Sequence, residues 1–152
     1  IDVVVHPQSI IHSMVEFTDG SVLAQLSRTD MCFPIQYALT WPRRVKGGLE
    51  PLNFAALAKL EFEAPRTADF PAIDLARRAG LTGGTLPAVY NAANEVAVDA
   101  FRAGKIPFPG IWECVAAVMD GHVVKPSDTL ESVVAADREA RDAGATFIGG
   151  RC

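Results

Sequence analysis

The sequence is poor in cysteine and in long apolar runs, and each shortage excludes a class of protein. Its three cysteines, Cys32, Cys114 and Cys152, are far apart and odd in number, which argues against a disulfide framework or a C-x-x-C zinc site. No apolar stretch approaches the roughly 20 residues that span a bilayer, and no basic segment followed by an apolar one opens the chain. We therefore expect no membrane association and a cytoplasmic location.

Clustered positive charge and nucleotide-binding glycine patterns are also missing. The net charge is −4, and the longest basic tract is Arg43-Arg44-Val45-Lys46, so we expect no nucleic-acid partner. The glycine pairs Gly47-Gly48 and Gly83-Gly84 lack the spacing of a dinucleotide or phosphate loop. No G-x-S-x-G elbow is present either. The chain is therefore predicted to hold no dinucleotide site of its own.

Polar side chains concentrate near the start of the chain, between His6 and Met14. The apolar run Val3-Val4-Val5 predicts a buried strand that ends at this cluster, which is where α/β enzymes commonly place chemistry. His6 is the best candidate, either as a functional group or as a histidine satisfied by backbone groups. A local metal site with His12 is disfavoured because residues six apart on one strand lie far from each other.

A β-hairpin is expected next, because Ile10–Thr18 and Ser21–Ser27 flank Asp19-Gly20, a dipeptide typical of two-residue turns. Such a turn pairs Phe17 with Val22 and Val15 with Ala24. It places Met14 and Leu23 together on a mixed face, which we expect at a subunit or domain contact.

A helix should follow the hairpin, with Asp30 as its N-cap and Trp41 at its end. From Pro42 to Ala68, prolines and glycines predict a connecting arm. The arm is expected to contain a short helix within 53–59 and a brief strand within 60–64. Between Asp69 and Gly144 the pattern is helical.

Four helices are expected in this last segment, which indicates a small four-helix bundle. The first is capped by Asp69 and stops at Gly80, the second begins at Thr85, and the third stops at Gly121. The fourth has a capping box of Asp128 and Glu131 and buries Leu130, Val133, Val134 and Ala140. The fold class is therefore α+β, and residues 145–152 form a tail without an assigned structure.

The second predicted helix carries Asn91, Asn94 and Glu95 on neighbouring turns. Asparagine is a poor helix former, so these residues need a compensating role. A structural polar network is favoured, and a ligand site is the alternative.

The motifs occur in a distinctive order, and together they resemble one family. They are HPQSIIHSM from His6, DGSVLAQL from Asp19, Asp30-Met31, Pro34-Ile35, WPRRV from Trp41, PLNF from Pro51 and NAANE from Asn91. Over nearly the whole chain this order is similar to the C-terminal part of the 1-deoxy-D-xylulose 5-phosphate reductoisomerase family.

The resemblance implies that residues 1–41 end an α/β catalytic and dimerisation domain, 42–68 form its connecting arm, and 69–144 form the helical domain. It also implies NADPH and a divalent metal (Mg, Mn or Co) as cofactors, a phosphorylated sugar as substrate, and a homodimer. The location implied is cytoplasmic in a bacterium, or plastid in a eukaryote. A non-catalytic helical interaction or dimerisation module is the alternative.

The family's NADPH, metal and lysine motifs are absent from this sequence, so we expect them upstream and expect the chain alone to be inactive. No metal ligand can be assigned here. The resemblance implies that His6 orients the metal-binding carboxylates or the substrate without binding the metal itself. It implies that Asp30 and Met31 lie near the nicotinamide. Relatives often have proline before Asp30, where this chain has Thr29.

Overall fold

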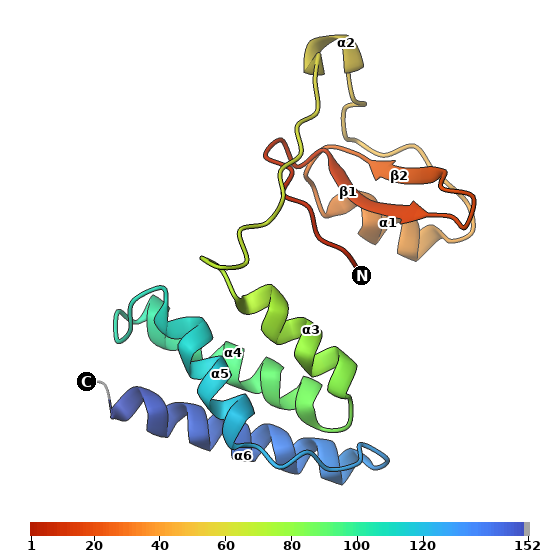
Figure 1. Ribbon diagram of the computed structural model, residues 1–152. Helices are drawn as coiled ribbons and strands as arrows, with labels where there is room; N and C mark the ends of the chain where they lie inside the picture. The colour runs from red at the N-terminus through yellow and green to blue at the C-terminus, as the bar shows by residue number, and fades with distance from the viewer. Residues whose placement is uncertain (151–152) are drawn as a thin grey trace. The chain divides into compact units, whose positions relative to one another are not determined.

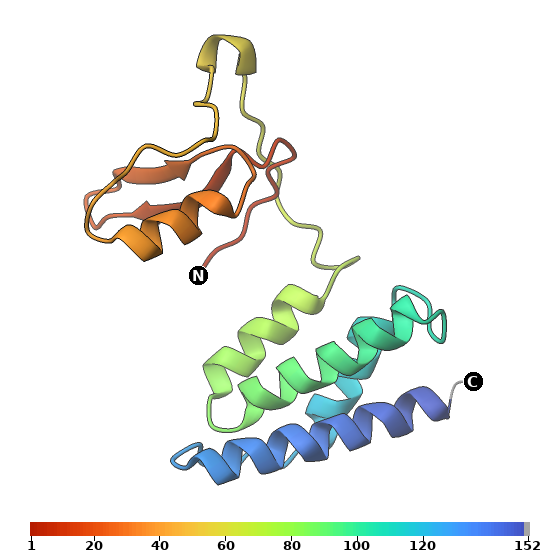
Figure 2. The same ribbon diagram turned by 180° about the vertical axis from the view of Figure 1, so that it is seen from behind.

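The computed structural model describes residues 1–150 and shows two compact units, one of Ile1–Pro65 and one that begins at Arg66 (Figure 1; Figure 2 from behind). The structure is mixed, as expected for the α+β class, with one two-stranded sheet and six helices among the described residues. Within the same residues, no helix combines the length and apolarity needed to cross a membrane.

The first unit contains a hairpin and two helices. Their bounds are Ile11–Glu16 for β1, Val22–Leu26 for β2, Cys32–Thr40 for α1 and Phe54–Leu57 for α2. Helix α1 begins one residue later than predicted, because its N-cap is Met31 rather than Asp30. The Asp30 carboxylate instead accepts the Cys32 backbone N–H at 2.8 Å from just before the helix. Helix α2 is shorter than predicted and is capped by Asn53, whose Oδ1 accepts the Ala56 N–H at 3.1 Å.

The hairpin is present, but its predicted pairing was wrong by one residue. Strand β1 runs antiparallel to β2, with Val15 opposite Leu23 and Met14 opposite Ala24. A shift of one residue exchanges the two faces of a strand. Met14 and Leu23 therefore lie on opposite faces, and the predicted mixed face that joined them does not exist.

The turn explains this shift. The Phe17 N–H donates to the Ser21 carbonyl at 2.9 Å, which leaves three loop residues rather than two, and Gly20 adopts φ +82°. This arrangement is typical of three-residue hairpin loops. The Asp19 carboxylate stabilises this three-residue loop by accepting hydrogen bonds from the N–H and the hydroxyl of Ser21, at 2.9 and 2.6 Å respectively.

The predicted strands at Val3-Val4-Val5 and within 60–64 are reduced to a single bridge. Val5 and Glu63 exchange two backbone hydrogen bonds of 2.9 Å, and no longer ladder forms at either segment. The side chains of Val3, Val4 and Val5 are 39–47% exposed. The expectation of a buried strand was therefore wrong for the described residues, because an apolar run is buried only when other elements cover both of its faces.

The first unit has no apolar core. All fully buried apolar side chains of residues 1–150 come from position 79 onward, and Ser27 is the buried residue of the first unit. Large apolar side chains are instead exposed across the hairpin, α1 and the arm. They include Met14, Val15, Phe17, Val22, Leu23, Met31, Ile35, Leu39, Trp41 and Phe54.

The second unit packs four helices around one core. Their bounds are Ala72–Thr82 for α3, Leu86–Arg102 for α4, Gly110–Gly121 for α5 and Leu130–Gly149 for α6. Helix α4 contacts the other three (Figure 1), and its inward face of Val89, Ala93 and Ala97 is fully buried. Small residues permit this close packing, since a Cβ added at Gly144 would lie 3.3 Å from Val96.

Several predicted details of these helices were wrong. Helix α3 continues past Gly80 to Thr82. Asp69 does not cap this helix but forms an ion pair with Arg66 at 3.4 Å. Helix α6 is capped by Thr129, which accepts the Ser132 N–H at 3.1 Å, rather than by Asp128.

The buried face of α6 also differs from the prediction. Leu130 and Val134 are exposed, Val133 is half-buried, and the buried residues form a stripe at four-residue spacing: Ala136, Ala140, Gly144 and Ile148. This stripe continues α6 to Gly149, so 145–149, predicted as tail, are helical. Cys152 lies outside the described residues. The division into catalytic-domain end, arm and helical domain stays a prediction.

Candidate functional site

His6 lies in a tight turn that is fastened to the arm. The Ser9 N–H donates to the His6 carbonyl at 3.0 Å, and Ser9 adopts φ +51°, which is unusual for a residue with a side chain. The His6 ring stacks on Phe62 with centroids 4.9 Å apart. Its Nδ1 lies 2.8 Å from the carbonyl oxygen of Glu61. The environments of the two ring nitrogens therefore decide whether His6 is satisfied by the backbone or has a nitrogen left for a functional role.

A carbonyl oxygen can only accept a hydrogen bond, so Nδ1 of His6 carries the proton of this contact. In the neutral ring, Nε2 is then left with a lone pair. Nε2 is buried and has no hydrogen-bond partner within the part of the chain that the structure describes. Buried polar atoms are rarely left unpaired. One nitrogen is thus satisfied by the backbone, while the other is available to a donor or a metal ion.

A reciprocal pair strengthens the attachment of this turn. The Gln8 side-chain amide donates to the Glu61 carboxylate at 2.7 Å, and the Glu61 N–H donates to Gln8 Oε1 at 3.1 Å. Lys59 adds an ion pair to the same carboxylate at 2.7 Å. Sequence reasoning missed Gln8 and Glu61 as partners, because 53 positions separate them and neither stands in a recognisable motif with the other.

Asp30 and Met31 lie between β2 and α1. The Cys32 backbone N–H, which donates to the Asp30 carboxylate, lowers the pKa of Asp30. That carboxylate is therefore engaged by the backbone at the start of α1, whose N-cap is Met31. The Met31 side chain is 69% exposed, so it is free to contact another apolar group.

A cavity of about 550 Å³ opens beside this segment. Its lining is Ile10, Arg28, Thr29, Asp30, Gly48, Leu49 and Glu50. Arg28 and Glu50 form an ion pair of 2.8 Å across it. The cavity brings Asp30 close to the hairpin and to the start of the arm within the first unit.

The predicted polar network of the second unit is only partly assembled. Asn91 donates to Glu95 at 3.0 Å, and Glu95 accepts Arg141 of α6 at 2.7 Å. Arg141 also donates to Asp137 at 2.7 Å. Among residues 1–150 the structure shows no side-chain hydrogen bond for Asn94. Arg141 and Asp137 were missed, although their four-residue spacing on a predicted helix was visible in the sequence.

This network shifts the titration of its members. Arg141, followed by Asn91, lowers the pKa of Glu95 by hydrogen bonding to its charged form. Asp137 and Glu95 raise the pKa of Arg141. The network therefore joins α4 to α6 most strongly when Glu95 is ionised.

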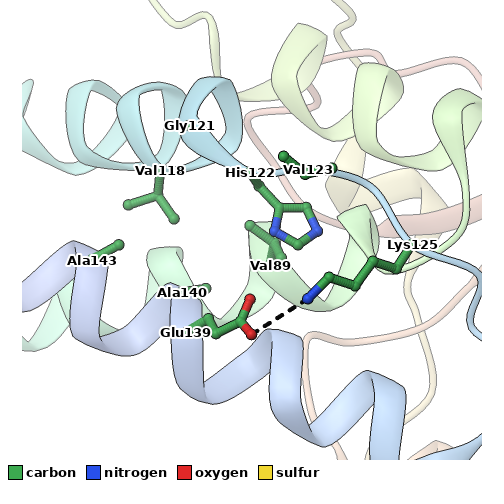
Figure 3. A pocket seen from close by; sticks show the side chains of 9 residues that line it. All are labelled: Val89, Val118, Gly121, His122, Val123, Lys125, Glu139, Ala140 and Ala143. Atoms are coloured by element: carbon green, nitrogen blue, oxygen red, sulfur yellow. Dashed lines mark hydrogen bonds and ion pairs between the residues drawn. The ribbon is translucent and has the colours of Figure 1, made fainter.

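A second cavity, of about 360 Å³, lies within the helical unit (Figure 3). Valine and alanine side chains from α4, α5 and α6 form its apolar wall, and Lys125 and Glu139 form an ion pair of 3.4 Å at its edge. His122 hydrogen-bonds at 2.8 Å to Thr85, which is fully buried and also accepts the Lys125 N–H at 3.1 Å. His122 thus fastens the loop between α5 and α6 to the start of α4.

No group of three or more histidine, cysteine, aspartate or glutamate side chains close enough to hold a metal ion occurs within the described residues. The two histidines weighed as a local metal pair, His6 and His12, differ in environment, since the ring of His6 stacks on Phe62 whereas His12 is exposed on β1.

The fold is an α+β segment with a hairpin unit and a helical unit, and comparisons with known proteins identify its family. The family described as DXP reductoisomerase C-terminal domain matches residues 26–143. The chain therefore belongs to this family.

Individual relatives agree. The chain is 57% identical over 143 residues to the 1-deoxy-D-xylulose 5-phosphate reductoisomerase of Symbiobacterium thermophilum. The aligned region covers 94% of the chain but 37% of that relative. The enzyme of Pseudomonas putida F1 is 51% identical over 142 residues, or 93% of the chain and 36% of that relative.

Solved structures show the same partial coverage. The Zymomonas mobilis enzyme in complex with NADPH matches with a TM-score of 0.88 and 46% identity, over 95% of this chain and 38% of that one. A reductoisomerase structure in complex with NADPH, fosmidomycin and magnesium matches with a TM-score of 0.83 and 37% identity, over 96% and 38%. The chain thus spans well under half the length of these relatives.

Replacement of Glu95 should weaken the link between α4 and α6 in a pH-dependent way. The folded-state pKa of Glu95 is lowered, so its contribution to stability is present above the unfolded-state pKa and is lost as the pH falls through the folded-state pKa. We expect Glu95→Gln to be less stable than the parent at neutral pH and to approach it in acid, once the pH has fallen below the lowered pKa of Glu95. Urea unfolding followed by circular dichroism measures both values.

Asp99→Asn is the matched control for Glu95→Gln, because Asp99 is an exposed carboxylate on the same helix. It should show no comparable loss at neutral pH. A Glu95→Gln deficit that stays constant across the pH range would contradict the role given to the ionised carboxylate.

Proposed function

We propose that this chain is the C-terminal part of a 1-deoxy-D-xylulose 5-phosphate reductoisomerase. The longer protein would convert 1-deoxy-D-xylulose 5-phosphate to 2-C-methyl-D-erythritol 4-phosphate, a precursor of isoprenoids. The observation that carries the proposal is the family match over residues 26–143, supported by the TM-score of 0.88 to an enzyme of that name. The named relatives are bacterial, and we propose a cytoplasmic location.

The domain assignment follows from the contrast between the two units. Residues 1–41 would complete an α/β catalytic domain, 42–68 would be its connecting arm, and 69 onward would be a four-helix bundle. The exposed apolar side chains of the first unit support this assignment. Apolar surface on such a scale usually marks an interface with other protein, and here it fits coverage by the rest of a catalytic domain.

His6 would act as a supporting group rather than as a metal ligand. Its Nδ1 is committed to the Glu61 carbonyl, and its buried Nε2 lacks a partner among the described residues. An imidazole held in one orientation in this way can position a metal-binding carboxylate or a substrate hydroxyl. The divalent metal (Mg, Mn or Co), when bound, would polarise the substrate oxygens, and its ligands would come from outside this chain.

Asp30 and Met31 would lie on the cofactor side. Bound NADPH would supply the hydride. The Asp30 carboxylate accepts the Cys32 N–H at the start of α1 and thereby fixes where the exposed Met31 side chain projects. An exposed thioether side chain suits apolar contact with a flat ring, which fits the proposed nicotinamide neighbour.

A homodimer is the proposed assembly. Both faces of the hairpin carry exposed apolar side chains: Val15 and Leu23 on one face are 55% and 66% exposed, and Val22 on the other is 56% exposed. Leu23 is the most exposed of these three side chains, so its face is the proposed subunit contact. A non-catalytic interaction module remains the alternative function, and it would use the same face without any reaction.

The activity proposal is tested with the longer protein that contains this chain. With 1-deoxy-D-xylulose 5-phosphate, NADPH and Mg²⁺, we expect substrate-dependent NADPH oxidation, whereas residues 1–152 alone should show none. His6→Gln in the longer protein should lower kcat/KM by about 10- to 100-fold, as loss of a supporting group near a metal does.

His12→Gln serves as the control, because His12 is an exposed imidazole on β1, outside the His6 turn. It should keep activity near that of the parent. Absence of substrate-dependent oxidation in the unmodified longer protein would overturn the enzyme assignment and favour the interaction module. Equal activity of His6→Gln and the parent would overturn the role of His6 alone.

The dimer proposal predicts that a charge at Leu23 disrupts association. Leu23→Lys in the longer protein should shift the mass measured by light scattering toward the monomer, because burying an unpaired ammonium is costly. Thr18→Lys adds the same charge in the hairpin turn and should leave the mass unchanged. A Leu23→Lys variant that remains dimeric with unchanged stability would argue against this contact.

A further inference from the structure

Thr29 joins two segments of the proposed active site that are otherwise distant in sequence. Its hydroxyl donates to the Ser9 carbonyl at 2.8 Å. Ser9 belongs to the His6 turn, because its N–H donates to the His6 carbonyl at 3.0 Å. One side of this hydrogen bond is thus part of the turn that orients the imidazole.

The other side of the hydrogen bond leads directly to Asp30 and Met31. Thr29 is the residue before Asp30, whose carboxylate is fixed to the start of α1 at 2.8 Å. The Asp30 N–H also donates to the Arg28 carbonyl at 2.8 Å, which closes the loop tightly around Thr29. A displacement of Thr29 would therefore move Met31 with it.

A neighbouring backbone hydrogen bond shows which part of this attachment depends on the side chain of residue 29. The Ser27 N–H donates to the Ile10 carbonyl at 3.1 Å. The carbonyls of Ser9 and Ile10 are consecutive acceptors, and the second is held by backbone that any residue would supply. The Ser9 carbonyl accepts from a side-chain hydroxyl, which only some residues carry. The identity of residue 29 therefore determines whether the Ser9 carbonyl is bonded as well as the Ile10 carbonyl.

The backbone at Ser9 increases the need for this anchor. A residue with a side chain at φ +51° is in the sparsely populated left-handed region, and such conformations persist only where the surroundings hold them. The Thr29 hydroxyl fixes the carbonyl of the strained residue. Arg28, on the other side of Thr29 from Asp30, is held across the cavity by its ion pair with Glu50 at 2.8 Å.

We propose that Thr29 is a positioning residue, whose hydroxyl fixes the His6 turn relative to the Asp30-Met31 segment. This inference rests on the proposed function, because it assigns the two segments to the substrate side and the cofactor side of one reaction. Hydride transfer depends steeply on the distance between donor and acceptor, and a displacement of about 1 Å can cost about 100-fold in rate. Thr29 would thus act on the reaction without touching a reacting atom.

The test uses Thr29→Val in the longer protein, which removes the hydroxyl and keeps the shape of the side chain. We expect kcat to fall about 10-fold, with KM for 1-deoxy-D-xylulose 5-phosphate changed much less. We also expect the primary isotope effect with 4-deuterated NADPH to increase, because the reduction step becomes more rate-limiting. Thr29→Ser retains the hydroxyl and should restore kcat and the isotope effect toward the parent values.

Two controls separate positioning from general damage. Thr82→Val makes the same change at an exposed threonine at the end of α3 and should leave the kinetics unchanged. Thr29→Ala, with circular dichroism and thermal unfolding, supplies a second variant without the hydroxyl. It should be folded and show the same loss of kcat as Thr29→Val.

The outcomes distinguish the two proposals. An unmodified longer protein without substrate-dependent NADPH oxidation overturns the proposed function itself. An active parent with Thr29→Val at the parent kcat overturns the inference, and so does a Thr29→Ser variant as impaired as Thr29→Val. A loss that appears only in KM, or only with a lowered unfolding temperature, also overturns it, because a purely structural role gives that result.

Discussion

The hydrogen bond from His6 Nδ1 to the Glu61 carbonyl oxygen, 2.8 Å long, holds together a unit that has almost no apolar interior. Along with the reciprocal pair between Gln8 and Glu61 and the bridge between Val5 and Glu63, it fastens the beginning of the chain to the arm. Each such hydrogen bond contributes about 0.5–1.5 kcal/mol net. The conformation of the first unit therefore depends on a small number of polar contacts near His6.

The second unit is stabilised by a different interaction. Its helices bury a continuous set of apolar side chains, among them Val89 and Met119, and full burial of one such side chain contributes about 1.5–3 kcal/mol. This contrast assigns stability to the helices and the candidate chemistry to the hairpin unit. The polar groups of functional interest lie in the unit whose apolar surface is exposed, and under the proposed domain assignment a larger catalytic domain would cover that surface.

The sequence predicted the elements better than their contacts. The start of α4 after Thr85 and the end of α5 at Gly121 are confirmed, because turn residues and glycines act locally, whereas α1 begins one residue later than predicted. The hairpin register was wrong, since Asp19 bonds Ser21 and lengthens the turn by one residue. The buried face of α6 was only partly right: Ala140 is buried as predicted, but Leu130 and Val134 are exposed, because the packed stripe begins at Ala136.

The site shows the same limit. The His6 turn, Asp30 and Met31 could be recognised from their motifs, whereas Glu61, Thr29 and Arg28 could not be assigned as their partners. Those contacts join residues separated by 20 to 55 positions, and such pairs leave no periodic signal in a single sequence. Family membership suggested the proposed reaction, and the structure supplied the contacts that would hold the proposed reacting groups in place.

The tautomer of His6 tests the account most directly. We would measure the ¹⁵N chemical shifts of the histidine ring nitrogens in this chain at mildly alkaline pH, where a free imidazole is neutral. The account predicts a protonated Nδ1 and an unprotonated Nε2 for His6, because the Glu61 carbonyl can only accept. A protonated Nε2, or averaged shifts typical of a freely exchanging ring, would contradict it.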